Sequence, residues 1–112
     1  MLRSASDFAA VGRSDVIRSD SRISARFVRT GRDGTRFGIS TSRRLGGAVV
    51  RNRIRRRIRE SLRALSPRVA PGFDILLVAR QGSITASQLE LTATLERLLR
   101  KGGALGEERT EG

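Results

Sequence analysis

The chain has 112 residues, enough for one small domain with one modest core and too few for two. It carries 23 lysine and arginine residues against 11 acidic residues, for a formal net charge of +12, and Lys101 is its only lysine. A domain this basic favours a polyanionic partner, and the planar guanidinium of arginine suits phosphate in particular. The sequence holds neither cysteine nor histidine, which excludes disulfides, thiol nucleophiles and imidazole acid–base chemistry.

The first residues, MLRSASDFAA, lack the apolar run of a secretory signal peptide. No stretch approaches the ~20 apolar residues that a membrane-spanning helix needs. The expectation is a soluble protein of the cytoplasm.

The N-terminal part of the sequence predicts one short helix followed by a loop. In residues 4–13, either Ser4 or Ser6 can cap a helix whose apolar face carries Phe8. Residues 14–22 are polar and are predicted to form the loop.

Two strands are predicted next, at residues 23–28 and 35–42, with a typical hairpin-turn pair, Asp33-Gly34, between them. The second strand has the alternation of a half-buried strand. Its two faces are Phe37, Ile39 and Thr41 on one side and Gly38, Ser40 and Ser42 on the other. The second face is small and polar, which leaves room for a ligand to lie on it.

A basic amphipathic helix is predicted from about residue 49 to residue 65, ended by Pro67 and Pro71. At ~100° per residue, its apolar side chains form one stripe: Val50, Ile54, Ile58, Leu62 and Leu65. The polar side chains cover the rest, with Arg56, Arg59, Arg63 and Asn52 opposite the stripe, Arg53 and Arg57 at one edge, and Arg55 at the other. The stripe predicts docking on a sheet, and the cations predict an outward basic face.

The basic face is unfavourable in isolation, because like charges four residues apart repel by a few tenths of a kcal/mol per pair. One acidic residue, Glu60, cannot balance them. A solvated surface helix usually mixes signs, so a nucleic-acid face explains this charge better. A membrane-surface helix is less favoured because the stripe has no aromatic anchor.

The C-terminal part predicts a strand and a helix. Residues 73–80 form a continuous apolar run, as expected of a strand buried on both faces. Residues 86–101 follow as a leucine-rich helix, with capping-box spacing at Ser87 and Glu90.

The order of these elements predicts an α/β fold, a two-layer sandwich in which helices pack against a small mixed sheet. Residues 1–103 are expected to form a single nucleic-acid-binding domain, and residues 104–112 a flexible acidic tail. The aspartates are scattered singly, so no catalytic or metal-binding constellation is visible in the protein itself. Phe8 and Phe27 are core residues by default but could line a groove for unstacked bases.

The segment from Ile39 to Glu60, ISTSRRLGGAVVRNRIRRRIRE, resembles the signature of the bacterial ribonuclease P protein subunit family. That signature is a strand ending in Ser-x-Ser with two cations, then Gly-x-Ala-Val, then Arg-Asn-Arg and further cations at helical spacing. The matching positions are Ser40, Ser42, Arg43, Arg44, Gly46, Ala48, Val49, Arg51, Asn52, Arg53, Arg55, Arg56 and Arg59. The rest of the chain resembles the family more weakly.

The resemblance implies an order of elements, α-β-β-β-α-β-α, and an activity. In that family the protein joins a large catalytic RNA, and the assembly is an endoribonuclease that removes the 5′ leader from precursor tRNA. The RNA carries the hydrolysis with Mg²⁺, and the protein alone is expected to bind no metal and no small-molecule cofactor.

The resemblance also implies two sets of binding residues. The set facing the catalytic RNA is Arg43, Arg44, Arg51, Asn52, Arg53, Arg55, Arg56 and Arg59. The set in a cleft for the single-stranded leader, between the first helix and the sheet, is Phe8, Phe27, Ser40, Ser42 and Arg80, with Arg43 as a further candidate. Gly12 and Thr30 stand where the family often has aromatic residues, so arginines would carry more of the leader contact.

Two other functions fit the composition. One is a ribosomal protein or another structural RNA-binding protein of similar size and charge. The other is a DNA-binding protein that inserts the basic helix into a major groove, which would usually require a dimer seam. The Arg-Asn-Arg context favours the ribonuclease P hypothesis over both.

Overall fold

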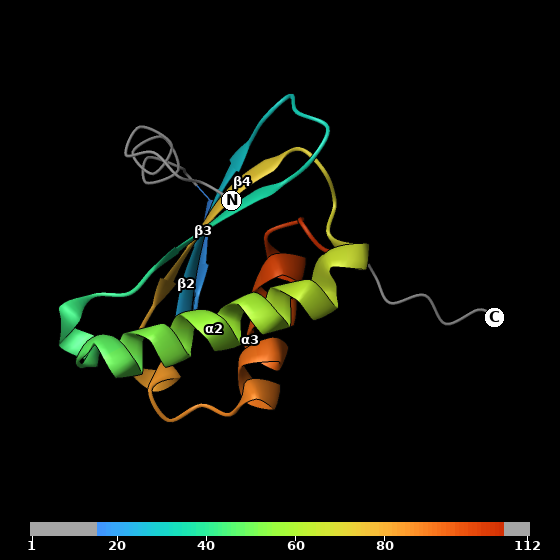
Figure 1. The fold of residues 1–112 in the computed structure, drawn as a ribbon. Coiled ribbons are helices and arrows are strands. Elements are labelled where there is room, and N and C mark those ends of the chain that lie inside the picture. The colour runs from blue at the N-terminus through green and yellow to red at the C-terminus, as the bar shows by residue number, and fades with distance from the viewer. Residues whose placement is uncertain (1–15, 107–112) are drawn as a thin grey trace.

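Four strands and two long helices make up the part of the chain that the computed structural model describes, residues 16–106 (Figure 1). The strands are β1 (Val16–Ser19), β2 (Ile23–Arg29), β3 (Arg36–Ser40) and β4 (Phe73–Ala79). The helices are α2 (Ala48–Leu65) and α3 (Gln88–Lys101), with short 3₁₀ turns η1 (Arg43–Leu45), η2 (Ser66–Arg68) and η3 (Gln81–Ser83).

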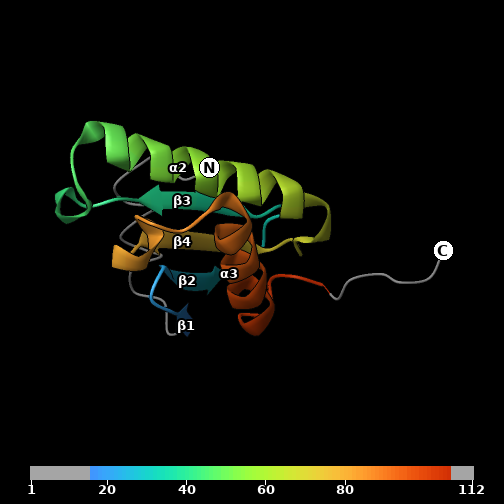
Figure 2. The ribbon, with the colours of Figure 1, turned by 90° about the horizontal axis from the view of Figure 1, so that it is seen from below.

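The strands form one mixed sheet in the order β1-β2-β4-β3. β1 with β2 and β2 with β4 are antiparallel, whereas β3 and β4 are parallel. Figure 2 shows β4 inside the sheet, with α2 along the β3 side and α3 across the middle. The continuous apolar run of β4 fits this central place, and the predicted α/β sandwich is confirmed.

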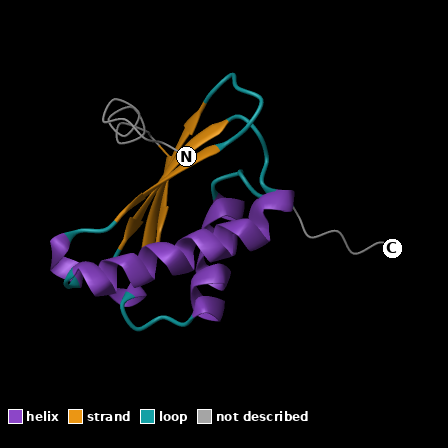
Figure 3. Cartoon of the chain, viewed as in Figure 1, coloured by secondary structure: helices purple, strands orange, loops and turns teal. Residues whose placement is uncertain are grey.

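One hydrophobic core lies between the sheet and the two helices, which cover the same side of the strands (Figure 3). The sheet contributes alternate residues of β2 and β4, and α2 contributes the predicted stripe, of which Ile54, Ile58, Leu62 and Leu65 are buried and Val50 is partly buried. α3 contributes Leu91, Leu95, Leu98 and Leu99. Its predicted capping box is present: the Ser87 hydroxyl accepts from the Glu90 amide, and the Glu90 carboxylate accepts from the Ser87 amide.

Two predictions about the first strands are wrong. The predicted loop at residues 14–22 contains β1, a short edge strand whose four side chains are all exposed. The hairpin between β2 and β3 does not form, because β4 lies between them and pairs with both. A strand that is apolar on both faces gains most at the centre of a sheet, and this gain outweighs the local turn signal at Asp33-Gly34.

The predicted domain boundary at residue 103 is too early. Gly103 ends α3 with φ +83°, the left-handed conformation that glycine adopts most easily, and the Ala104 amide then donates to the Leu99 carbonyl at 2.9 Å. Ala104 and Leu105 are buried in the core, and the Ala104 carbonyl accepts from the Ala70 amide at 2.8 Å. The packed chain therefore continues to Gly106. The predicted first helix with Phe8, and the end of the predicted tail, lie outside the described residues.

Gly102 offers a direct test of the packing between α3 and the sheet. A Cβ placed there would overlap atoms of the Phe27 ring, which is 3% exposed and packs edge-on against Phe73. Because the ring has no free space to move into, Gly102→Ala should lower the free energy of unfolding by about 2 kcal/mol. Urea unfolding measures this loss. Gly31→Ala is the control, since no atom lies within 4 Å of a Cβ there, and an equal loss in both variants would contradict the packing argument.

Candidate RNA-binding surface

The cationic surface begins where β3 ends. Ser40 is the exposed last residue of β3, and Ser42 precedes the turn η1 in an extended conformation. Leu45 is buried and anchors this turn, so that Arg43 and Arg44 are exposed beside the sheet.

Two glycines then redirect the chain into α2. Gly46 has φ +137°, which L side chains rarely adopt, and a Cβ there would lie 3.1 Å from the Val50 Cβ. Gly47 precedes the helix, and the first turn of α2 carries no acidic side chain and no side-chain cap. The positive end of the helix dipole therefore adds to the charge of Arg43 and Arg44.

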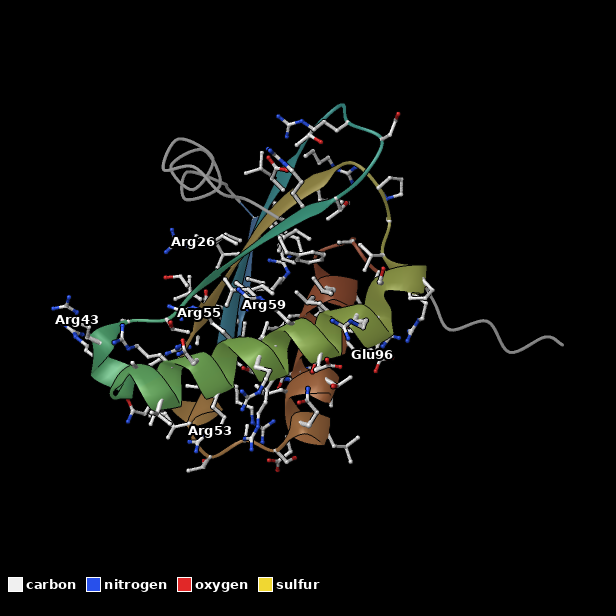
Figure 4. All side chains as sticks on the ribbon, in the orientation of Figure 1. Arg26, Arg43, Arg53, Arg55, Arg59 and Glu96 are labelled. Atoms are coloured by element: carbon white, nitrogen blue, oxygen red, sulfur yellow. The ribbon has the colours of Figure 1, made fainter. Side chains whose placement is uncertain are left out.

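The arginines of α2 point in different directions around the helix (Figure 4). Arg55 and Arg59 project towards β3, whereas Arg53 projects from the other side of the helix. Asn52 and Arg56 are exposed, and the Arg55 guanidinium donates to the Asn52 side-chain oxygen at 2.9 Å. This bond orients the Asn52 amide and leaves its N–H₂ group available to a ligand.

Exposure separates the remaining members of the predicted RNA-facing set. Arg59 is exposed, whereas Arg51, Arg53 and Arg55 are half-buried, with their stems against the protein. The RNA-facing residues predicted on α2 therefore differ in exposure and direction, and they do not form one flat face.

Arg57 serves the fold, a role that the sequence pattern does not reveal. Its guanidinium donates to the Ala86 carbonyl at 2.8 Å, and its own carbonyl accepts from Gln88 at 2.6 Å. The Gln88 amide also donates to the hydroxyl of Ser61, which is buried and lies 2.6 Å from the Thr92 hydroxyl. These bonds fix the rotation of α2 against α3 and so decide which arginines face outward.

Acidic side chains neutralise arginines elsewhere on the molecule. Asp74 pairs with Arg36 and Arg32, and Glu96 pairs with Arg68 and Arg100. Hydrogen bonds from Arg36 to Asp74 and from Arg68 to Glu96 lower the pKa of both carboxyl groups, so both stay ionised.

The positive charge is concentrated on α2 because few acidic side chains reach it. Within residues 16–106, Arg63 is the one arginine of α2 that has an acidic partner, Glu60 at 3.1 Å. The other arginines of α2 have no acidic partner among these residues; they are Arg51, Arg53, Arg55, Arg56, Arg57 and Arg59. Such a field attracts a polyanion and raises its rate of association.

The residues predicted for a leader cleft are only partly brought together. β3 and β4 are parallel and in register, Ser40 with Val78, so Ser40, Ser42 and Arg80 lie at the same end of the sheet. The Arg80 guanidinium is held there by the Asp20 carbonyl, which accepts at 2.6 Å. Phe8 lies outside the described residues.

The prediction that Phe27 lines the leader cleft is wrong. It is 3% exposed, on the face of β2 that packs against the helices, and its ring contacts Phe73. A base cannot stack on a ring that is enclosed by the core, so Phe27 serves packing.

Arg26 is a surface residue that the sequence reasoning missed. It is paired with Leu76 across β2 and β4, on the side of the sheet away from α2 and α3, and Figure 4 shows it projecting from that side. Val28, Leu76 and Val78 form a small apolar cluster on this same side. The signal was present in the alternation of Ala25, Arg26 and Phe27, which puts a cation opposite the core.

Taken together, the fold and this surface define a small, basic α/β protein that presents an arginine-rich helix to a polyanion. The family model described as Ribonuclease P matches residues 1–103. The chain belongs to the ribonuclease P protein family.

Curated relatives agree with this family. The ribonuclease P protein component of Roseiflexus castenholzii is 46% identical over 72 residues, which cover 63% of this chain and 59% of the relative. That of Chloroflexus aggregans is 44% identical over 81 residues, which cover 71% of this chain and 60% of the relative. The matched segments therefore span about three-fifths of these relatives' length.

Solved structures agree over a longer part of the chain. The RNase P protein of Staphylococcus aureus superposes with a TM-score of 0.84 at 26% identity, covering 94% of this chain and 96% of that one. The RNase P protein of Thermotoga maritima gives a TM-score of 0.82 at 26% identity, with 89% and 94% coverage. The mixed sheet and its two covering helices are thus a fold shared with RNase P proteins.

Proposed function

We propose that this chain is the protein subunit of a ribonuclease P ribonucleoprotein, an endonuclease that removes the 5′ leader from precursor tRNA. In this proposal a catalytic RNA carries the chemistry, and the protein binds that RNA and the leader and assists the binding of substrate and metal. The family match supports the assignment, and it favours this function over a ribosomal or other structural RNA-binding protein.

The observation that carries the proposal is the unneutralised charge of α2. Arg53, Arg56 and Arg59 have no acidic partner in the described part of the chain, although four acidic side chains elsewhere are engaged by arginines. A helix kept cationic in this way is complementary to an RNA backbone. Ser40, Ser42 and Arg80 lie at one end of the sheet and can contact the leader there.

We assign Mg²⁺ to the RNA of the assembly rather than to the protein. Among residues 16–106, no three Asp, Glu, His or Cys side chains are grouped as a metal site would require. When bound, the metal would supply the activated water and stabilise the leaving group. The arginines of α2 would hold the RNA in the arrangement that positions the metal.

The place of action proposed is the cytoplasm, where bacterial tRNA precursors are made. Among the described residues, no helix is both long enough and apolar enough to span a membrane.

Reconstitution tests the proposal directly. The full chain is added to a bacterial ribonuclease P RNA and a precursor tRNA at a Mg²⁺ concentration too low for the RNA alone, and release of the 5′ leader is followed on a gel. We expect cleavage to be restored, because protein cations replace part of the screening that Mg²⁺ provides. Absence of cleavage at every protein concentration would overturn the proposal, and a basic ribosomal protein serves as the control for non-specific charge.

A further inference from the structure

A groove runs between the outer edge of β3 and the side of α2 that faces it. Alternate residues of the strand segment line one wall: Thr35, Phe37, Ile39 and Thr41. Arginines four residues apart on α2 line the other: Arg55, Arg59 and Arg63. Alternate strand residues are about 6.6 Å apart, and i, i+4 side chains on a helix are spaced by about 6 Å, so the two rows run side by side in step.

The hollow at the carboxyl end of β3, of about 390 Å³, is lined by Ile39, Thr41 and Arg55, and the rest of the groove lies at the amino end of the strand. Two hollows there, of about 260 and 210 Å³, share Thr35, Phe37 and Ser66 and so form one continuous depression. Phe37, Leu62 and Val69 give it an apolar floor. A depression with this size and lining has room for one flat aromatic ring beside Phe37.

Phe37 differs from the other described phenylalanines. Phe27 and Phe73 are each 3% exposed, whereas Phe37 is half-buried, packing one part of its ring on the core and leaving the rest in the hollow. Aromatic rings exposed beside cations are where unstacked bases bind.

The wall of the hollow is rigid. The Thr35 hydroxyl donates to the Ala70 carbonyl at 2.7 Å and accepts from the Phe73 amide at 3.2 Å. Next to it, the Arg36 guanidinium is held by the buried Asp74 carboxylate. A ligand therefore meets a preformed surface and does not have to order it.

The charged side chains around the hollow favour one orientation of a bound ligand. Arg59 is exposed and has no acidic partner within residues 16–106, and Arg63 beside it is shared with Glu60. Asp33 lies at the opposite end and repels phosphate. A phosphate is favoured at the arginine end, and an N–H group of a base at the Asp33 end, where the carboxylate accepts hydrogen bonds.

We propose that this hollow binds one unpaired nucleotide of the catalytic RNA, with its base against Phe37 and its phosphate at Arg59 and Arg63. The inference rests on the proposed function. The leader is a less suitable occupant, because its candidate contacts, Ser40 and Arg80, lie at the other end of β3 and β4.

Two substitutions test the hollow without removing the fold. Phe37→Leu keeps the core contact but removes the stacking ring, and Arg59→Gln removes the phosphate contact. We expect each to weaken binding of the catalytic RNA by roughly tenfold. Lys101→Gln is a charge-matched control on the exposed end of α3 and should change the affinity by less than about twofold. Wild-type affinity in both groove variants would overturn the inference.

Cross-linking identifies the occupant, and the absence of cysteine makes the label unique. A photoactivatable group on Ser66→Cys should cross-link to an unpaired nucleotide of the catalytic RNA in the assembled complex. The same group on Ala93→Cys, exposed on α3, should not. Cross-links to the precursor leader, or none from Ser66→Cys, would overturn the assignment even if Phe37→Leu failed to fold.

The two proposals fail in different ways. If the wild-type chain restores cleavage but the groove variants bind RNA normally, the hollow has another role and the proposed function stands. If the wild-type chain restores no cleavage, the proposed function fails first.

Discussion

Replacing Arg53 and Arg56 together with alanine should lower the affinity for the catalytic RNA by at least about tenfold and flatten its dependence on salt. Each phosphate contact contributes roughly 0.7 to 0.9 to the slope of log affinity against log salt concentration. Losing two contacts should therefore reduce that slope by about 1.4 to 1.8. Filter binding over a range of salt concentrations measures both quantities.

The control for this experiment is a pair of cations away from α2. Arg18 on β1 and Lys101 on α3 are exposed, and removing both changes the net charge by the same amount. If this control flattened the salt dependence as much as the α2 variant, binding would depend on net charge alone. An unchanged slope in the α2 variant would show that Arg53 and Arg56 do not contact phosphate.

Asp74→Asn should lower the free energy of unfolding by about 2 kcal/mol near neutral pH. The Asp74 side chain is 9% exposed and accepts two hydrogen bonds from Arg36, at 2.9 and 2.6 Å, and more distant ones from Arg32. An amide cannot satisfy both guanidinium groups, and the half-buried Arg36 would lose the carboxylate that holds it. Urea unfolding measures the loss, with the exposed Asp33→Asn as the control.

The same ion pair predicts a pH dependence. Hydrogen bonds from Arg36 lower the pKa of Asp74 below its ordinary value of 3.8. The stability that the pair contributes is therefore fully present above the unfolded-state pKa and is lost as the pH falls through the folded-state pKa. The difference between wild type and Asp74→Asn should shrink in strong acid. A difference that stayed constant down to about pH 2 would show that the ionised carboxylate is not the cause.

The parts of the structure that were predicted correctly are those that local periodicity determines. The spacing of Ile54, Ile58 and Leu62 fixes which side of α2 is buried, whatever it packs against. Ser87 and Glu90 cap α3 through bonds between residues close together in the chain. The run at residues 73–79 is apolar on both faces, which is enough to place it inside a sheet.

The parts that were missed depend on contacts between distant segments. Nothing near Asp33-Gly34 shows that β4, which follows only after the whole of α2, will separate β2 from β3. Arg57 has the same local pattern as its neighbours, and only the position of Ala86 shows that it is a structural residue. For Phe27 the sequence left both the core and the leader cleft open, and only the covering helices decide for the core. The sequence therefore predicted that α2 carries the candidate surface. It did not predict that the arginines of α2 divide into separate faces.

The central position of β4 has a consequence for the order of events during synthesis. β2 and β3 do not pair with each other. α2 is synthesised before β4, the strand that completes the sheet surface on which α2 packs. Until residues 73–79 have left the ribosome, the apolar stripe of α2 has little of its final docking surface, although its arginines are already able to bind RNA. Folding of this chain should be concerted and late, and an RNA partner that meets the nascent chain would encounter the binding helix before the domain that orients it.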